Sequence, residues 1–217
     1  MPAGRNRNHM PALLSSLAAG FIFLTGISPV SGADDEMMSE ATESAAFAAV
    51  RASVVDVDLP VVQLTRADGQ AVTLSKALSD RRPVVLNFIY TSCGSTCPVL
   101  SQMIAEFRAR LGAARSRVHV VSISIDPEQD TPAVLRRYAR RFHAGPGWDY
   151  YTGTLSASEA VQKSFGVYRG DKMSHPAVTF LREGGGTRWT RVDGFATPVQ
   201  LMSYYQRLLA AAPAKST

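Results

Sequence analysis

Two continuous runs of apolar residues constrain the fold of this chain more than any other feature of its sequence. The first, RPVVLNFIY, spans residues 82–90, and the second, RVHVVSISI, spans residues 117–125. Short runs of this kind, rich in β-branched and aromatic residues, are typical of strands that are buried on both faces. Such strands occur in sheets that helices cover on each side, so the sequence predicts a layered α/β fold.

Helix and turn signals between and after these runs complete the pattern. Pro98 suits the first turn of a helix that continues to Gly112, and Thr131 followed by Pro132 provides the start of a second helix. The other predicted elements are two short strands around a turn at 67–70, a helix near 156–166, a hairpin over 177–194 and a last helix over 196–212. This order predicts a thioredoxin-like α/β fold with a mixed central sheet flanked by helices and extra N-terminal strands.

The first 33 residues are typical of a segment that directs export. Residues 1–9 carry two arginines, residues 11–27 are apolar and uncharged, and the small residues up to Ala33 suit cleavage. Left uncleaved, residues 10–33 are long enough to span a membrane. Both alternatives place the rest of the chain outside the cytoplasm, in the periplasm of a bacterial host, either soluble or tethered to the inner membrane by residues 10–33.

We expect a flexible tether over residues 34–53 and a single folded domain over residues 54–212. The tether is acidic and rich in alanine, with few large apolar side chains to bury. Without residues 1–33, the chain loses two of its 23 basic residues, which leaves 21 basic against 18 acidic residues, or a net charge of +3. A charge this small indicates no nucleic-acid partner.

The two cysteines of the chain, Cys93 and Cys97, lie four residues apart between the first buried strand and its helix. On a turn that opens a helix, their Cβ atoms would lie about 5–6 Å apart, so the thiols could form a disulfide or share one ion. A purely structural disulfide would close a very short loop and would stabilise the fold little. A redox pair and a metal site remain, and the helix N-terminus favours the thiolate that both require.

A metal site needs a further ligand. Two thiolates leave zinc short of its usual four ligands, whereas Cu(I) is satisfied by two sulfurs and one imidazole. Three of the four histidines lie in segments that indicate targeting or structural roles: His9, His119 and His143. His175 instead precedes a predicted strand, in a loop that thioredoxin-like folds place beside the cysteine turn, and Pro176 stands where such loops often carry a cis-proline. We therefore predict that His175 joins Cys93 and Cys97 as a ligand.

Four segments resemble motifs of the Sco/SenC proteins. NFIYTSCGSTCPVLS, residues 87–101, resembles their Cys-x-x-x-Cys-Pro motif, and SISIDPEQDTPAVLRRY, residues 122–138, resembles their Ser-x-Asp-Pro-x-x-Asp-Thr segment. WDYYTGT, residues 148–154, is similar to their Trp-x-x-x-Thr-Gly turn, and SFGVY, residues 164–168, to the run before their histidine loop. The similarity covers about residues 59–209.

This resemblance implies a copper-binding domain in which Cys93, Cys97 and His175 hold Cu(I), Cu(II) or both. It also implies a copper chaperone that helps to build the binuclear copper site of cytochrome c oxidase. The partner would be the copper-site subunit of that oxidase or another periplasmic copper protein. The family usually has an aspartate immediately before the histidine, and this chain has Ser174 there.

A thiol–disulfide oxidoreductase that acts on the cysteines of a partner is the alternative function. In that case Cys93 would attack, Cys97 would resolve the mixed disulfide, and His175 would not be required. A peroxidase of the peroxiredoxin type is disfavoured. Those enzymes need a threonine or serine three residues before the reactive cysteine, and this chain has Tyr90 and Gly94 at those positions.

Overall fold

A computed structural model describes residues 50–211 of the chain. The predicted export segment, the tether as far as residue 49 and the final residue of the predicted domain lie outside the described residues. Strand β1, Arg51–Asp56, begins three residues before the predicted domain boundary at residue 54, and it pairs with a later strand along its whole length. Within the described part of the chain, no helix combines the length and the apolar character needed to cross a membrane.

The described residues form one eight-stranded mixed sheet with the strand order β1-β8-β7-β4-β5-β6-β2-β3. Strands β4, β5 and β6 are parallel to one another, and the other pairings are antiparallel. After β1, the strands are β2 Gln63–Arg66, β3 Ala71–Thr73, β4 Val84–Ile89, β5 His119–Ser124, β6 Trp148–Gly153, β7 Val178–Arg182 and β8 Arg188–Asp193. The helices are α2 Leu74–Ala77, α3 Thr96–Leu111, α4 Pro132–Arg141, α5 Leu155–Ser164 and α6 Pro198–Ala211, with short 3-10 helices η1 Gly112–Arg117 and η2 Lys172–Ser174.

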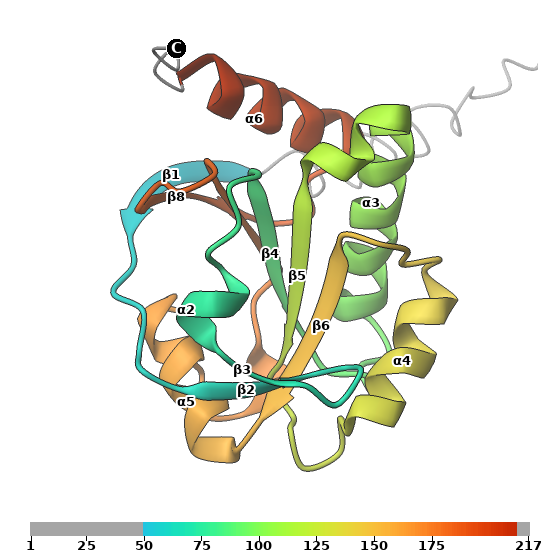
Figure 1. Cartoon of the computed structure of the whole chain (residues 1–217), viewed down its shortest axis with the longest axis vertical. Coiled ribbons are helices and arrows are strands. Elements are labelled where there is room, and N and C mark those ends of the chain that lie inside the picture. Colours follow the sequence, from blue (N-terminus) through green and yellow to red (C-terminus); the bar gives the residue numbers. More distant parts are fainter. Residues whose placement is uncertain (1–49, 212–217) are drawn as a thin grey trace, which may run out of the picture. The chain divides into compact units, whose positions relative to one another are not determined.

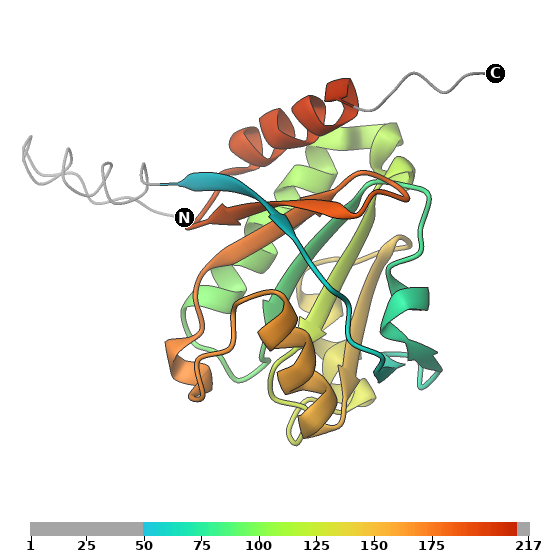
Figure 2. The same cartoon turned by 90° about the vertical axis from the view of Figure 1, so that its left-hand side faces the viewer.

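The predicted thioredoxin-like fold is confirmed, and the two apolar runs are its central parallel strands. Every residue of β4 and β5 is buried. Helices α3, α4 and α6 lie on one face of the sheet, and α2 and α5 lie on the other (Figure 1, Figure 2). Burial on both faces explains why apolar residues dominate β4, whereas β5 also buries the polar residues His119, Ser122 and Ser124.

The helix starts follow local capping chemistry. The Thr131 side chain accepts a hydrogen bond from the Val134 N–H, and Pro132 opens α4 as predicted. Helix α5 begins earlier than predicted, because the Thr154 side chain accepts a hydrogen bond from the Ala157 N–H and the helix starts at the next residue. No strand was predicted over the residues of β6, although they form part of the WDYYTGT motif at residues 148–154.

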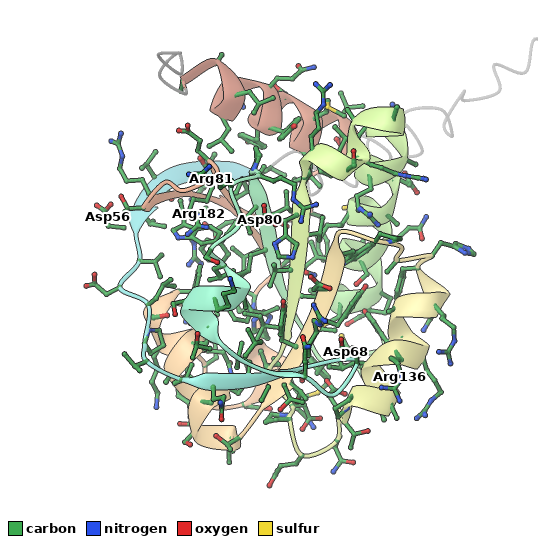
Figure 3. The ribbon with its side chains drawn as sticks, viewed as in Figure 1. Asp56, Asp68, Asp80, Arg81, Arg136 and Arg182 are labelled. Atoms are coloured by element: carbon green, nitrogen blue, oxygen red, sulfur yellow. The ribbon has the colours of Figure 1, made fainter. Side chains whose placement is uncertain are left out.

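Two arginines fix loops that border the sheet. Arg136 of α4 donates a hydrogen bond to the carbonyl oxygen of Ala67 in the β2–β3 turn, beside Asp68 (Figure 3). Arg182 of β7 is buried, donates to the carbonyl oxygen of Leu78, and stacks its guanidinium 4.7 Å from the centre of the Trp189 ring. Each contact joins two segments that are distant in the sequence. Together they fix the β2–β3 turn to α4 and the end of α2 to β7.

Candidate metal centre

The two cysteines lie where strand β4 gives way to helix α3, and both are free thiols. Cys93 is 7% exposed and Cys97 is 1% exposed. The backbone N–H of Cys97 donates a hydrogen bond to the Cys93 sulfur, with 3.3 Å between nitrogen and sulfur. Folding therefore places the two thiols together at the first turn of a helix, with Cys93 toward the surface and Cys97 behind it.

The protein environment separates the pKa values of the two thiols. Burial acts to raise the pKa of Cys93, but the backbone N–H groups of Cys97 and Ser95 and the Tyr90 side chain favour its thiolate, and together they lower the pKa to about 7. Burial raises the pKa of Cys97 to about 12, and its interaction with the Cys93 thiol adds to the shift. The expectation that the helix terminus favours the thiolate thus holds for Cys93 and is wrong for Cys97.

This difference predicts a pH-dependent reactivity for one thiol. The thiolate fraction of Cys93 increases as the pH rises through about 7, so its alkylation by iodoacetamide should accelerate with a midpoint near that pH. Cys97 should remain largely unmodified across the same range. The measurement is peptide mapping by mass spectrometry after timed alkylation of the reduced chain. A Cys93→Ser variant should lose the fast reaction, and a midpoint at the ordinary thiol pKa of about 8.5 would contradict the prediction.

A buried carboxylate fixes the start of the cysteine turn. Asp130 is fully buried and accepts hydrogen bonds from the Thr91 N–H at 3.2 Å, the Thr91 hydroxyl at 2.5 Å and the Ser124 hydroxyl at 2.6 Å. Burial raises the pKa of Asp130, while these donors oppose the shift. Asp130, the second aspartate of the Asp-Pro-x-x-Asp-Thr motif, therefore links the segment after β4 to the end of β5. The sequence did not predict this link.

The loop that carries the predicted histidine is held beside the cysteine turn by two side chains. Lys172 forms an ion pair with Asp126, with 2.6 Å between Nζ and Oδ2. The Tyr90 hydroxyl donates a hydrogen bond to the sulfur of Met173, with 3.4 Å between oxygen and sulfur. The Asp171 carboxylate accepts from the Met173 N–H and opens the short helix η2. Because Tyr90 stands three residues before Cys93, the predicted proximity of this loop to the cysteine turn is confirmed.

His175 itself is half-buried and packs against Phe88, with 5.9 Å between the ring centres. Its Nε2 atom is buried and has no hydrogen-bond partner among the described residues. Burial and the positive charge of Arg169 lower the pKa of His175 to about 4, so the imidazole is neutral at physiological pH. A neutral imidazole with an unpaired nitrogen is the form that can bind a metal ion.

The structure does not bring all three predicted ligands into one cluster. Within residues 50–211, no three His, Cys, Asp or Glu side chains are arranged so that they could hold a metal ion. The cysteines are together, whereas His175 lines a small cavity with Glu159 and Tyr168. The suggestion that Pro176 is a cis-proline is wrong, because the described residues contain no cis peptide bond.

The other described histidines agree with the structural roles that the sequence indicated. His119 is buried in β5, and its Nε2 lies 2.9 Å from an oxygen of Asp149. His143 follows the basic helix α4 and adopts a positive φ of 51°. Neither joins the cysteine turn.

The side chains that sequence reasoning missed are Tyr90, Lys172 and Asp130, all of which touch the turn or the histidine loop.

A thioredoxin-like sheet with two free cysteines at the start of helix α3 defines the class of this chain: it is a thioredoxin-like protein with a pair of thiols. The model of the SCO1/SenC family matches residues 61–210. The chain belongs to the SCO1/SenC family.

Similar proteins and solved structures support this assignment. The chain is 30% identical over 101 residues to the SCO1 protein homolog of Bacillus subtilis, a match that covers 45% of this chain and 51% of the relative. It thus spans about half of that relative's length. The structure of Bradyrhizobium japonicum ScoI with copper bound is 29% identical, with a TM-score of 0.58, and the match covers 69% of this chain and 98% of that one. BsSco, described as a member of the Sco family of cytochrome c oxidase assembly proteins, shares the fold at 22% identity with a TM-score of 0.61, over 74% of this chain and 98% of its own.

Proposed function

We propose that this chain is a copper chaperone that binds copper through Cys93, Cys97 and His175 and helps to build the binuclear copper site of cytochrome c oxidase. Its place of action would be the periplasm, with the chain soluble or tethered to the inner membrane. Membership of the SCO1/SenC family supports the role, and so does the copper bound to the similar Bradyrhizobium protein. The recipient would be the copper-site subunit of the oxidase or another periplasmic copper protein.

The observation that carries the proposal is the pair of free thiols at the start of α3. Two thiol sulfurs and an imidazole match the preference of copper for soft and borderline donors. Cys93 supplies a thiolate near neutral pH, and His175 has no proton to lose because it is already neutral. The donor set therefore fits copper as cargo, with Cys97 releasing a proton on binding and Cys93, which is about half ionised near pH 7, releasing a fraction of one.

His175 must approach the thiols for all three residues to share one ion. The segment that carries it is held to the loop after β5 by the Lys172–Asp126 ion pair, and to the residue that follows β4 by the weak contact between Tyr90 and Met173. Lys172 is partly exposed, but Asp126 is buried, so this pair anchors the histidine loop to the segment that follows β5. A shared ion would therefore require the His175 ring to move from its contact with Phe88 toward the thiols.

The test is an anaerobic titration of the reduced chain with Cu(I) against a coloured competing chelator. We expect about one copper per chain for the native protein, and for His175→Ala an affinity at least about 10-fold weaker, since even supporting partners of metal ligands have effects of that size. His143→Asn is the matched control, because His143 is exposed and asparagine tolerates its positive φ. Equal affinities for His175→Ala and the native chain would remove His175 from the proposed site.

A thiol–disulfide oxidoreductase is the second candidate, and the separation of the two thiol pKa values favours it. The Cys93 thiolate would attack a disulfide of the partner, one partner sulfur would leave as a thiolate, and Cys97 would then displace the other after losing its proton. The products are a Cys93–Cys97 disulfide and a reduced partner. A Cys97→Ser variant that accumulates a mixed disulfide with the partner, together with full activity of His175→Ala, would favour this function over copper delivery.

A further inference from the structure

We propose that Met173 is an additional copper-binding residue, whose thioether sulfur holds Cu(I) together with the cysteine thiols. This inference rests on the proposed copper function. Its basis is the contact between the Met173 sulfur and the Tyr90 hydroxyl, at 3.4 Å. Because η2 lies 83 residues from Tyr90 in the sequence, folding alone creates this contact.

Tyr90 connects Met173 to the thiols. Its ring is buried, and its carbonyl oxygen accepts a hydrogen bond from the Cys93 N–H at 3.2 Å. The Tyr90 side chain also interacts with the Cys93 thiol. The sulfurs of Met173 and Cys93 are thus both neighbours of the same tyrosine side chain, which places a third sulfur at the edge of the cysteine turn.

The exposure of Met173 is unusual for its residue type. Its side chain is 72% exposed, although methionine commonly fills gaps in apolar cores. The loop does not leave this residue loose, because the Asp171 carboxylate binds the Met173 N–H at 2.9 Å and the adjacent Lys172 is paired with Asp126. The local structure therefore holds a thioether open to solvent at a defined position, where it contributes little to packing.

A thioether is a suitable ligand for a Cu(I) ion that the protein must later release. Methionine is a soft ligand that matches Cu(I), and it carries no proton that must leave before the metal binds. It is neutral and weaker than a thiolate, so copper held by it remains exchangeable. On binding, the Tyr90–Met173 hydrogen bond is given up and a copper–sulfur bond forms, with copper remaining Cu(I) throughout. His175, whose ring lines the cavity beside Tyr168, lies deeper than this sulfur.

The first test uses the full chain labelled with selenomethionine and loaded with one Cu(I). X-ray absorption at the selenium edge should detect a copper–selenium path in the labelled native sequence. Met173→Leu should lose that path, and Met202→Leu should retain it, because Met202 lies on α6. Leucine at the exposed position 173 should leave the thermal unfolding midpoint unchanged, so loss of the signal would not reflect unfolding. The absence of the path in the labelled native chain, or its persistence in Met173→Leu, would overturn the inference.

The second test measures Cu(I) affinity by anaerobic chelator competition for the same variants. We expect Met173→Leu to bind about 10-fold more weakly than the native chain, and the weakening to be larger when His175→Ala is also present. Native binding that requires both cysteines but is unaffected by Met173→Leu would overturn this inference and leave the proposed function standing. If the native chain fails to bind Cu(I) through its thiols, the proposed function fails, and the role of Met173 fails with it.

Discussion

Replacing Cys93 with serine is expected to abolish high-affinity Cu(I) binding. Serine offers a hard hydroxyl that stays protonated near neutral pH, whereas Cys93 supplies a soft thiolate with a pKa of about 7. Loss of a supporting partner around a metal site costs 10–100-fold in affinity, so loss of a direct ligand should cost more than about 100-fold. Anaerobic competition with a chromophoric Cu(I) chelator measures the change.

The cysteine turn offers its own controls for this experiment. Cys97→Ser should cause a loss of similar size, because both sulfurs are needed to hold the ion, and oxidation of the native pair to a disulfide should prevent binding by removing both thiolates. Ser92→Ala changes an exposed residue of the same turn and should bind like the native chain. If Cys93→Ser still bound one Cu(I) with native affinity, the copper site would have to lie elsewhere.

Replacing Phe88 with alanine is expected to have the largest effect on stability. Phe88 is fully buried in the central strand β4, and its ring centre lies 5.6 Å from that of Phe165 and 6.3 Å from that of Phe180. Truncating a buried phenylalanine removes both its transfer free energy and its packing, which costs about 3–5 kcal/mol. Urea denaturation of the reduced chain measures the free energy of unfolding.

Two control variants distinguish the stability lost with the packing of Phe88 from the stability that any substitution can cost. Phe88→Leu retains most of the volume and should cost about half as much or less. Leu155→Ala, at a side chain that is 50% exposed, should cost less than about 1 kcal/mol. Because Phe88 also packs against His175, Phe88→Ala should weaken Cu(I) binding as well as stability. A stability loss below about 1 kcal/mol would show that the aromatic cluster does not support β4 as described.

The central strands could be predicted from sequence because the signal that identifies them is local. Strands β4 and β5 are buried on both faces, so each appears as a short run rich in β-branched and other apolar residues, without charged side chains. Strand β1 lacks such a signal, since most of its residues are exposed and it is held by pairing with β8, far along the chain. Strand β6 contains Asp149 and Gly153, which weaken its apolar pattern. Strands β1 and β6 form by pairing with strands that lie elsewhere in the sequence. A local sequence pattern carries no signal for such pairing.

The same distinction applies to the candidate site. The spacing of Cys93 and Cys97 was sufficient to predict that the thiols meet, because four residues at a helix start fix their geometry. The position of the His175 ring was not predictable, since it depends on packing against Phe88 and on a loop held from a distance. The ion pair of Lys172 with Asp126 joins residues 46 positions apart and carries no local sequence signal.

The hydrogen bonds of Asp130 make one side of the candidate site more rigid than the other. Thr91 and Ser124 donate to the same buried carboxylate, so the entrance to the cysteine turn cannot move without the end of β5. The opposite side is held by the pair of Lys172 with the buried Asp126 and by one weak contact to sulfur. If copper is shared with His175, we expect the segment around His175 to adjust, because the contacts of Asp130 fix the other side. A partner that docks against the cysteine turn would then meet a rigid side at Thr91 and, at His175, a side whose shape differs between the loaded and the empty protein.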